Sequence, residues 1–411
     1  MAAPKQIRII SELYYPEETS TGHIVTGIAE GLAASDGYSV SVLCAQPTYS
    51  QKGVVAPKQQ CRNSVSIKRL AAPVGDKNSL IGRLWSMFSL TVRFGFSMFA
   101  FIKRGDIVMV VTNPPSLPLL VGWIARLQGA VPVLLVHDVY PDVLVPTGIT
   151  REGSLLYRFV DLFQRHMLRR MRRIVVLGRD MEERILAKLP SPDRSRFSII
   201  PNWGDASAIR PELRAKNSVR MRHGLTDKFI IQFSGNLGRT HGLEDLVALA
   251  EGLKPREDIH FLVFGWGAGR NWLEDTIKEL RLTNMTLLPP CEKTELGDYL
   301  TACDLFFMPF KKGMEGISVP SRLYNVMAAG SPILAVAGKT SELAQVVEEE
   351  AMGWVVSPGD IDSMIAAVEE AILQPEQLSV MSEHARGALE AKYTREHVVR
   401  QFENLFENVG K

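Results

Sequence analysis

The sequence predicts an α/β protein with two doubly wound, Rossmann-like domains that face each other across a cleft. Its 411 residues exceed what one ordinary hydrophobic core holds, which indicates two domains. Apolar runs of strand length alternate with helical patterns, as in parallel sheets whose strands are joined by helices. The alternation lapses once, over residues 203–228, where Pro, Gly, Asn and charged residues cluster as they do between domains.

The predicted strands form one series on each side of this connection. Their residues are apolar or β-branched almost throughout, which is typical of strands buried on both faces of a parallel sheet. Helical segments between them supply the crossovers, and a last helix is expected over residues 394–409. The first series comprises residues 7–10, 38–44, 107–112, 131–137, 174–177 and 198–200, and the second comprises residues 229–234, 260–264, 285–288, 305–308, 333–336 and 354–356.

The composition is that of a globular protein. Hydrophobic residues make up 46% of the chain and charged residues 22%, which argues against long disordered stretches. The four cysteines include no CxxC pair, so we expect neither a disulfide framework nor a structural zinc site, and favour a reducing, cytoplasmic environment. The first ten residues, MAAPKQIRII, contain no apolar stretch of signal-peptide length, which fits that expectation.

The net charge of +2 conceals a division of charge along the chain. Residues 1–203 contain 25 Lys and Arg against 15 Asp and Glu, whereas residues 204–411 contain 22 against 30. A basic half implies an anionic neighbour such as a phosphate, a nucleic acid or a lipid surface. Nucleic acid is disfavoured, because no DNA-reading helix or aromatic platform accompanies the positive charge.

Residues 84–102 form an apolar segment close to membrane-spanning length. Arg93 at its centre would cost at least about 2.5 kcal/mol in a bilayer, so a span is the least favoured interpretation. We expect a crossover helix of the first domain. The alternative is a helix in a membrane interface, because Arg83, Lys103 and Arg104 flank the segment.

Residues 155–173 combine an apolar stripe at helical spacing with a basic end. One interpretation is a helix that faces the core and ends in a solvated basic turn, which matches the helix dipole. The other is contact with an anionic lipid or a lipid diphosphate, and the sequence leaves both open. The stripe consists of Leu156, Phe159, Val160, Phe163, Met167 and Met171, and the basic residues are Arg165, Arg169, Arg170, Arg172 and Arg173.

Two features of the first half indicate ligand binding. The run TSTG, which ends at Gly22, precedes a helix, and backbone N–H groups of small residues there can approach a phosphate. Ser20 or Thr21 can instead cap the helix, which is the preferred interpretation of the run alone. His137 ends a buried apolar strand, where ligands bind in open parallel sheets, and an imidazole there can donate or accept a proton.

Asp138 and Asp142 follow His137 closely. Their carboxylates either orient the histidine or cap the loop that follows the strand. The sequence gives no further basis for choosing between these two roles.

The second half has two glycine-rich loops, each after a predicted buried strand. In FSGNLGRTHGLEDL the glycines permit close approach of the backbone to a ligand, and Arg239 adds a fixed cation. In FGWGAGRNW the glycines at 265, 267 and 269 do not complete a GxGxxG dinucleotide fingerprint, because Arg270 stands at the third glycine position.

The segment FFMPFKKGMEGISVPSRLYNVMAAG carries the strongest indication of anion binding. A predicted strand ends at Pro309, a loop with Lys311 and Lys312 follows, and Ser321 and Arg322 open a helix. Unpaired N–H groups at the helix start, together with the guanidinium of Arg322, predict a diphosphate site.

These motifs are similar to those of retaining glycosyltransferases of family 4, which have the GT-B fold. The chain most resembles the colanic acid, fucosaminyl and related surface-polysaccharide enzymes of that family. The order and spacing of the motifs carry the resemblance across essentially the whole chain. They are ISELYYPEETSTG, HDVYPDVLVPTG, IIPNW, FSGNLGRTHGLE, FGWGAGRNWLE and SVPSRLYNVMAAGSPILAV.

The resemblance implies metal-independent transfer of a sugar, without a cofactor, from a nucleotide donor to an acceptor hydroxyl with retained anomeric configuration. It assigns residues 204–390 to the nucleotide sugar and residues 1–203 to the acceptor, often a polyprenyl-diphosphate-linked sugar at the cytoplasmic face of the membrane. Residues 391–411 would form a helix that returns to the first domain. The protein would be cytoplasmic and peripheral on an anionic membrane surface.

The resemblance also implies roles for single residues. His137 matches the family histidine that contacts the donor sugar, and Gly22 matches the glycine loop near the diphosphate. Arg239 and the helix start at Ser321 would hold the diphosphate. Together with the residue reasoning above, the predicted catalytic residues are His137, Arg239 and Arg322, and the predicted substrate-binding residues are Gly22, Asn236, Gly265, Gly267, Glu315, Ser321 and Asn325.

The chain departs from the family pattern at several of these positions. Asn325 replaces the family's second Glu, which usually holds the ribose, and Glu315 stands two residues before the position of the first. An Asn can still hydrogen-bond ribose hydroxyls, without charge. Asn236 and His241 stand where the family has Arg and Lys, which leaves Arg239 as the substitute cation.

The expected mechanism is front-face displacement, in which fixed cations stabilise the departing nucleoside diphosphate and the leaving phosphate helps to deprotonate the acceptor. No spacing of metal ligands is apparent in the sequence. Two other functions are considered: an epimerase acting on a nucleotide sugar, and a non-catalytic subunit that binds one.

Overall fold

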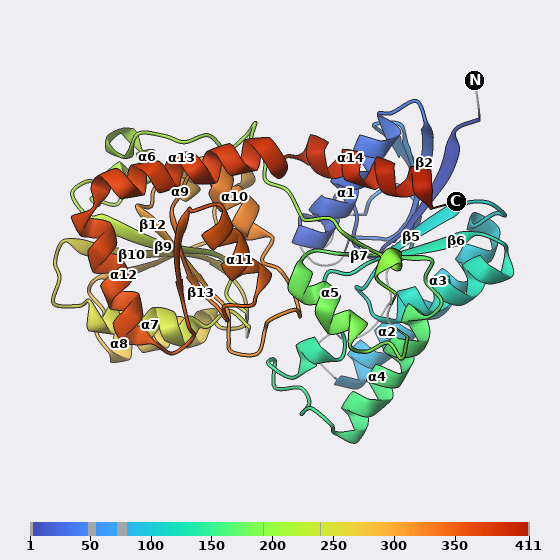
Figure 1. Ribbon diagram of the computed structural model, residues 1–411, viewed down its shortest axis with the longest axis horizontal. Helices are drawn as coiled ribbons and strands as arrows, with labels where there is room; N and C mark the ends of the chain where they lie inside the picture. Colours follow the sequence, from blue (N-terminus) through green and yellow to red (C-terminus); the bar gives the residue numbers. More distant parts are fainter. Residues whose placement is uncertain (1–2, 48–54, 72–79, 192, 239, 410–411) are drawn as a thin grey trace. The chain divides into compact units, whose positions relative to one another are not determined.

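The computed structural model describes residues 3–47, 55–71, 80–191, 193–238 and 240–409. The chain divides into two compact units, each an α/β unit built on a mainly parallel sheet (Figure 1). The first unit comprises Met1–Val143, Thr150–Asn202 and Arg395–Lys411, and the second comprises Leu144–Ile149 and Trp203–Thr394.

The first unit contains an eight-stranded sheet in the order β3-β4-β2-β1-β5-β6-β7-β8. All neighbours are parallel except β3 and β4, and the chain reverses its direction of winding between β1 and β5. The six strands predicted for this half are all present. The strands are β1 (Lys5–Ile10), β2 (Tyr38–Ala45), β3 (Gln59–Arg62), β4 (Val65–Leu70), β5 (Ile107–Val111), β6 (Val131–Leu135), β7 (Arg173–Val176) and β8 (Phe197–Ile199).

The helices of the first unit connect these strands and cover the sheet. The last helix packs on the first: a Cβ added at Gly31 of α1 would overlap Val399 of α14. The Tyr38 hydroxyl donates to the Glu403 carbonyl at 3.1 Å, which also fixes α14 in this unit. The helices are α1 (Ser20–Ala33), α2 (Leu80–Phe101), α3 (Ser116–Leu127), α4 (Leu155–Leu168), α5 (Arg179–Leu186) and α14 (Arg395–Asn408).

The second unit contains a six-stranded, fully parallel sheet in the order β11-β10-β9-β12-β13-β14. The winding reverses between β9 and β12, so this unit is doubly wound, and all six predicted strands are present. The strands are β9 (Phe229–Asn236), β10 (Ile259–Trp266), β11 (Met285–Leu288), β12 (Leu305–Pro309), β13 (Ile333–Val336) and β14 (Gly353–Val356).

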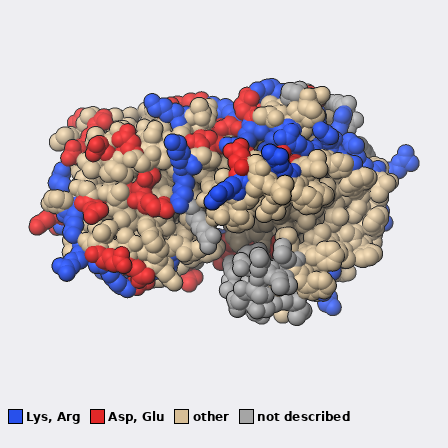
Figure 2. Space-filling view, turned by 90° about the horizontal axis from the view of Figure 1, so that it is seen from below, with Lys and Arg blue, Asp and Glu red and all other residues tan. Residues whose placement is uncertain are grey.

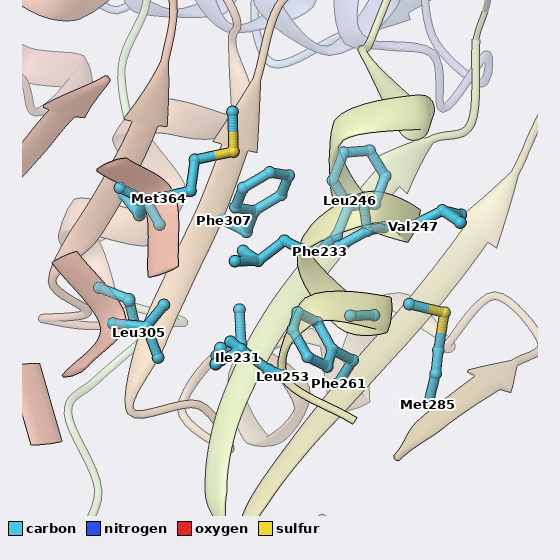
Figure 3. Packing of buried hydrophobic residues seen from close by; sticks show 14 of the residues in the cluster. Ile231, Phe233, Leu246, Val247, Leu253, Phe261, Met285, Leu305, Phe307 and Met364 are labelled. Atoms are coloured by element: carbon cyan, nitrogen blue, oxygen red, sulfur yellow. The ribbon is translucent and has the colours of Figure 1, made fainter. Parts of the chain in front are cut away.

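Helices on both faces bury this sheet. Figure 3 shows Phe233, Phe261 and Phe307 of three neighbouring strands packed with Leu246 of α7 and Met364 of α12, in a cluster of buried side chains. Continuous apolar strands therefore build the core that holds the strand ends in place. The helices are α6 (Ser218–Arg222), α7 (Leu243–Gly252), α8 (Arg270–Glu279), α9 (Leu296–Leu300), α10 (Arg322–Ala328), α11 (Glu342–Glu349), α12 (Ile361–Leu373) and α13 (Pro375–Lys392).

The two apolar segments whose role the sequence left open are both helices of the first unit. α2 is the expected crossover helix, and it buries Leu90, Phe94 and Met98 against the unit. Among the described residues, no helix is both long enough and apolar enough to cross a membrane.

α4 ends at Leu168, earlier than the predicted helix, and Arg173 already begins β7. A wholly core-facing stripe is wrong for this helix. Met167 is buried, but Phe159 is 61% exposed and Phe163 is 42% exposed.

Candidate functional site

In the first unit, His137 lies past the end of β6, one strand away from the point between β1 and β5 where the winding of the sheet reverses. It follows β6 by two residues, and its Nδ1 lies 3.1 Å from the Thr21 hydroxyl in the first turn of α1. Its backbone N–H donates to the hydroxyl of Thr112, one residue past β5, at 3.1 Å. Residues after β1, β5 and β6 therefore meet at the carboxyl edge, the usual ligand site of a doubly wound sheet.

The imidazole of His137 is uncharged at neutral pH, because burial lowers its pKa to about 4. Its Nε2 is buried and has no hydrogen-bond partner among the residues that the structure describes. A buried polar atom left unpaired costs about 1–3 kcal/mol, which a hydroxyl of a bound ligand would offset. Burial also raises the pKa of the adjacent Asp138 carboxyl to about 6.

The start of α1 differs from the expected cap. Thr19 is the N-cap, and its hydroxyl accepts from the Gly22 N–H at 3.2 Å, so capping by Ser20 or Thr21 is wrong. Thr21 instead contacts His137. A Cβ at Gly22 would lie 2.6 Å from the Glu17 carbonyl oxygen, so glycine is needed for the loop to pack here. A contact between Gly22 and a diphosphate stays a prediction.

Asp142 belongs to a buried ion network that holds the segment after His137. Its carboxylate accepts from Arg184 at 2.7 Å and from Lys188 at 2.6 Å, and Lys188 also bonds Asp161 of α4 at 2.8 Å. These contacts join Asp142 to Arg184 and Lys188 and none of them reaches His137, so they do not support its predicted role in orienting the histidine. Removing one member of such a network leaves a buried charge uncompensated.

In the second unit, glycines at the ends of β9 and β10 adopt backbone conformations that disfavour a side chain. Gly235, Gly265 and Gly267 have φ values of 111°, 145° and 149°, which other residues rarely adopt. A Cβ at Gly265 would overlap the Gly235 carbonyl, and one at Gly267 would lie 2.6 Å from Asn236 Oδ1. Asn236 is exposed at the end of β9, so predicted binding residues share this carboxyl edge.

Arg322 lies against the same edge. Its Nη1 donates to the Ser234 carbonyl at 2.6 Å, and its guanidinium carbon lies 4.8 Å from the centre of the Phe233 ring. Burial lowers its pKa to about 10, so the side chain stays positively charged at neutral pH. A guanidinium has five N–H donors, so it can hold a phosphate while it bonds Ser234. Ser321 occupies the N-cap position of α10, but its side chain makes no capping bond to the helix.

His241 lies near Arg322. Burial, reinforced by the positive charge of Arg322, lowers the pKa of His241 well below its ordinary value. The Thr240 hydroxyl lies 3.2 Å from its Nδ1. A neutral histidine thus stands where the family has Lys. Arg239, the other predicted cation, lies outside the described residues.

Glu315 and Asn325 occupy different surroundings. A Cβ at Gly338, just past β13, would overlap the Glu315 carboxylate, so Glu315 reaches the carboxyl edge of the sheet. The Asn325 Oδ1 accepts from the backbone N–H of Asp205 at 3.1 Å. The NH2 group of Asn325, with two donors, can bond a ribose hydroxyl, and its Oδ1 has a second lone pair.

The sequence reasoning missed Trp266 as a binding candidate. It is the last residue of β10, pairs in register with Asn236, and is 59% exposed. It stands between Gly265 and Gly267 in the sequence, at the carboxyl edge where ligands bind in doubly wound sheets. The signal in the sequence was a large aromatic residue between two glycines at the end of a buried strand.

Comparisons with known proteins agree with this arrangement. The model of the glycosyl transferase 4-like domain matches residues 21–203, and that of the glycosyl transferases group 1 matches residues 216–388. The Pseudomonas aeruginosa protein WbjE, named as a glycosyltransferase, is 30% identical over 370 residues, 89% of either chain. The chain belongs to this glycosyltransferase family. The resemblance drawn from the motifs is thereby confirmed.

A second relative and two solved structures extend the comparison of this glycosyltransferase. The Escherichia coli K12 protein WcaI, named as a colanic acid biosynthesis glycosyl transferase, is 27% identical over 95% of this chain and 97% of its own. Sucrose-phosphate synthase from Thermosynechococcus elongatus has a TM-score of 0.76 at 18% identity, over 98% of this chain and 99% of its own. HepE of Anabaena, solved in complex with UDP and glucose, has a TM-score of 0.74 at 12% identity over the same shares. The predicted GT-B fold is confirmed.

Proposed function

We propose that this glycosyltransferase moves a sugar from a UDP-linked donor to a hydroxyl of an acceptor glycan, with retention of the anomeric configuration. The acceptor would be linked to a polyprenyl diphosphate and used in bacterial surface polysaccharide synthesis. The observation that carries the proposal is the charged Arg322 beside the glycine-lined ends of β9 and β10. The name of WcaI supports a role in polysaccharide synthesis, and the UDP complex of HepE supports a UDP-linked donor.

In this proposal residues 204–390 hold the nucleotide. The diphosphate lies at the edge formed by Gly235, Gly265 and Gly267, where backbone can approach it closely. Arg322 neutralises charge that grows on the leaving diphosphate, and a neutral His241 can donate one hydrogen bond to it. Arg239 and Ser321 keep their expected roles at the diphosphate.

Trp266 would be the platform for the base. Its exposed ring at the end of β10 can stack on a uracil, a contact that tolerates other bases because every base has a π-face. Asn325 would hold the ribose through its NH2 group, and Glu315 would contact the sugar or ribose from the loop after β12.

Residues 1–203 would bind the acceptor, with the neutral His137 orienting the transferred sugar. The unpaired Nε2 of this ring is suited to a sugar hydroxyl, because a hydroxyl can accept from a protonated Nε2 and donate to an unprotonated one. With a pKa of about 4, the ring has little basicity, so it positions the sugar while the leaving phosphate helps to deprotonate the acceptor. A lipid-linked acceptor would place the enzyme at the cytoplasmic face of a membrane.

The test is a screen of nucleotides and UDP-sugars by thermal shift, followed by product analysis. A nucleotide at about 100 times its dissociation constant adds about 2.7 kcal/mol of stability, so UDP should raise the melting temperature more than ADP or GDP. NMR of the product from an α-linked donor should show an α-linkage, and a β-linkage would contradict retention. Epimer formed from donor alone would indicate an epimerase, and binding without turnover would indicate a non-catalytic subunit.

A further inference from the structure

The first unit exposes an unusual number of large apolar side chains on three helices. Of the 23 exposed large hydrophobic residues in the described part of the chain, 13 lie on α2, α3 and α4. Monomeric proteins rarely leave large contiguous apolar areas in water unless they bind something. We name this area the apolar face. It consists of Trp85, Met87, Phe88, Val92, Phe96 and Phe99 of α2, Trp123 and Leu127 of α3, and Leu155, Leu156, Phe159, Leu162 and Phe163 of α4.

The exposure follows helical spacing within α2. Trp85, Phe88, Val92, Phe96 and Phe99 recur every three or four residues, and Phe96 is 78% exposed. The opposite side of the same helix buries its apolar residues against the unit. α2 is therefore apolar on both sides, which burial in the protein core does not explain.

The three helices are packed side by side. The Thr91 hydroxyl of α2 lies 2.7 Å from the Ser116 hydroxyl of α3, which joins these two helices. Arg170, two residues past α4, stacks over Trp123 of α3 at 4.0 Å, and His166 of α4 lies 5.8 Å from the same ring. Seen from the side where α2 and α4 lie in Figure 1, Figure 2 shows much of the first unit as uncharged residues, with Lys and Arg and some Asp and Glu along the upper border.

Basic residues predominate around the apolar face, with Glu152 as an exposed acidic residue in the turn before α4. The three helices contain one acidic residue, Asp161, and it is buried and bonded to Lys188. Exposed basic residues accompany them instead: Arg93, Arg126, Arg158, Lys103, Arg104, Arg169 and Arg172. Exposed aromatic residues within a basic surround match an anionic lipid surface, where rings enter the headgroup region and cations face lipid phosphates.

We propose that the apolar face is a docking surface for a bilayer that contains anionic lipids. A second copy of the chain is a poorer occupant, because a two-fold interface would bring the same basic residues of both copies together. The apolar side chains of α2 and α4 enter the bilayer, and neither helix crosses it. The biological meaning of this docking rests on the proposed function, since a lipid-linked acceptor would then be presented to the first unit.

The experiment is flotation of the full-length protein with vesicles, without donor or acceptor. Vesicles of phosphatidylethanolamine and phosphatidylglycerol should carry the protein at low salt, and phosphatidylcholine vesicles should carry much less. Phe96→Ser and Phe159→Ser should each lower partitioning about tenfold or more, because each removes a ring that the bilayer buries. Arg158→Gln should weaken binding to the anionic vesicles about fivefold.

The matched control is Leu373→Ser, which alters a side chain that is 79% exposed on α12 of the second unit. Its partitioning should equal that of the unaltered protein. The proposal is overturned if the protein stays out of the floating fraction with anionic vesicles at low salt, or if Leu373→Ser lowers partitioning as much as Phe96→Ser. A dimer in light scattering that Phe96→Ser dissociates, without vesicle binding, would assign the face to a second copy instead.

The outcome is separable from that of the proposed function. A protein that floats but binds no UDP keeps the docking surface and contradicts the nucleotide site. A protein that binds UDP and transfers sugar to a free glycan, but never floats, keeps the transferase and contradicts the docking surface.

Discussion

The two units present chemically different carboxyl edges although both sheets reverse their winding at one point. In the first unit the edge holds a neutral imidazole and two hydroxyls, at His137, Thr21 and Thr112. In the second it holds a buried guanidinium and glycine backbone, at Arg322 and Gly265. The first unit is nevertheless the basic half of the chain and the second the acidic half. The charge of a domain thus describes its outer surface, and the charge of its site has to be read from the residues at the strand ends.

If this contrast governs function, the largest effect should come from the cation of the second unit. Arg322→Gln should lower kcat/KM for a UDP-sugar by about 10² to 10³, because removal of one donor to developing charge typically costs about 3–4 kcal/mol. Arg256→Gln is the matched control, since that arginine pairs with Asp258 on the surface of the same unit. Both variants are assayed by initial rates after their melting temperatures are compared. An Arg322→Gln enzyme as active as Arg256→Gln would contradict a diphosphate at this edge.

The first unit offers a test through pH. The pKa of His137 is lowered to about 4 by burial, so its unfolded state binds more protons below pH 6.5, and stability is lost as the pH falls from about 6.5 to 4. The pKa of Asp138 is raised to about 6, so its contribution has the opposite sign: stability is lost as the pH rises from about 4 to 6. The two neighbours should largely offset each other in the unaltered protein.

Single substitutions should separate these slopes. In the Asp138→Asn variant, the free energy of unfolding should fall by about 2–3 kcal/mol as the pH is lowered from 6.5 to 4. In the His137→Gln variant, it should rise over the same decrease in pH. Urea unfolding at several pH values measures both. Parallel pH profiles for the two variants would mean that the residues are not buried as described.

The sequence predicted this contrast only in part. Position at a strand end was enough to select His137 and the glycines of β9 and β10, because buried parallel strands are plainly apolar and their ends can be located. The partners Thr21 and Thr112 depend on which strands are neighbours, and that order is set by packing rather than by local pattern. Strands β3 and β4 were missed because one face of each is solvated, so their residues alternate with polar ones.

The apolar stripes of α2 and α4 show a second limit. A stripe at helical spacing looks the same whether it meets a protein core or another apolar surface, so the sequence left both interpretations open for Phe159 and Phe163. Met171 continues the spacing of α4 but lies beyond its end, just before β7, which is why the predicted helix was too long. Only the tertiary structure distinguishes these cases.

A smaller effect is expected at Trp266, at the edge of the second sheet. Trp266→Ala should weaken UDP binding by about 1–3 kcal/mol, the usual contribution of a base stacked on an aromatic ring. Trp272→Ala is the control, because Trp272 is also exposed, at 43%, on the following helix α8. Isothermal titration with UDP measures both. Equal affinities for UDP and inorganic diphosphate in the unaltered protein would show that no base is stacked.

The smallest effect concerns a pairing that occurs in both units. A threonine hydroxyl lies 3.1 Å from His137 in the first unit and 3.2 Å from His241 in the second, in each case at Nδ1. Loss of one neutral hydrogen bond is worth about 0.5–1.5 kcal/mol, so Thr21→Val and Thr240→Val should each change kinetics by about two- to tenfold. Under the proposed function, Thr21→Val should lower kcat, because His137 would then orient the sugar less well. Thr240→Val should raise KM for the donor, because His241 would contact the diphosphate. If both variants changed the same parameter, the two histidines would share one role, and the division of labour between the edges would be wrong.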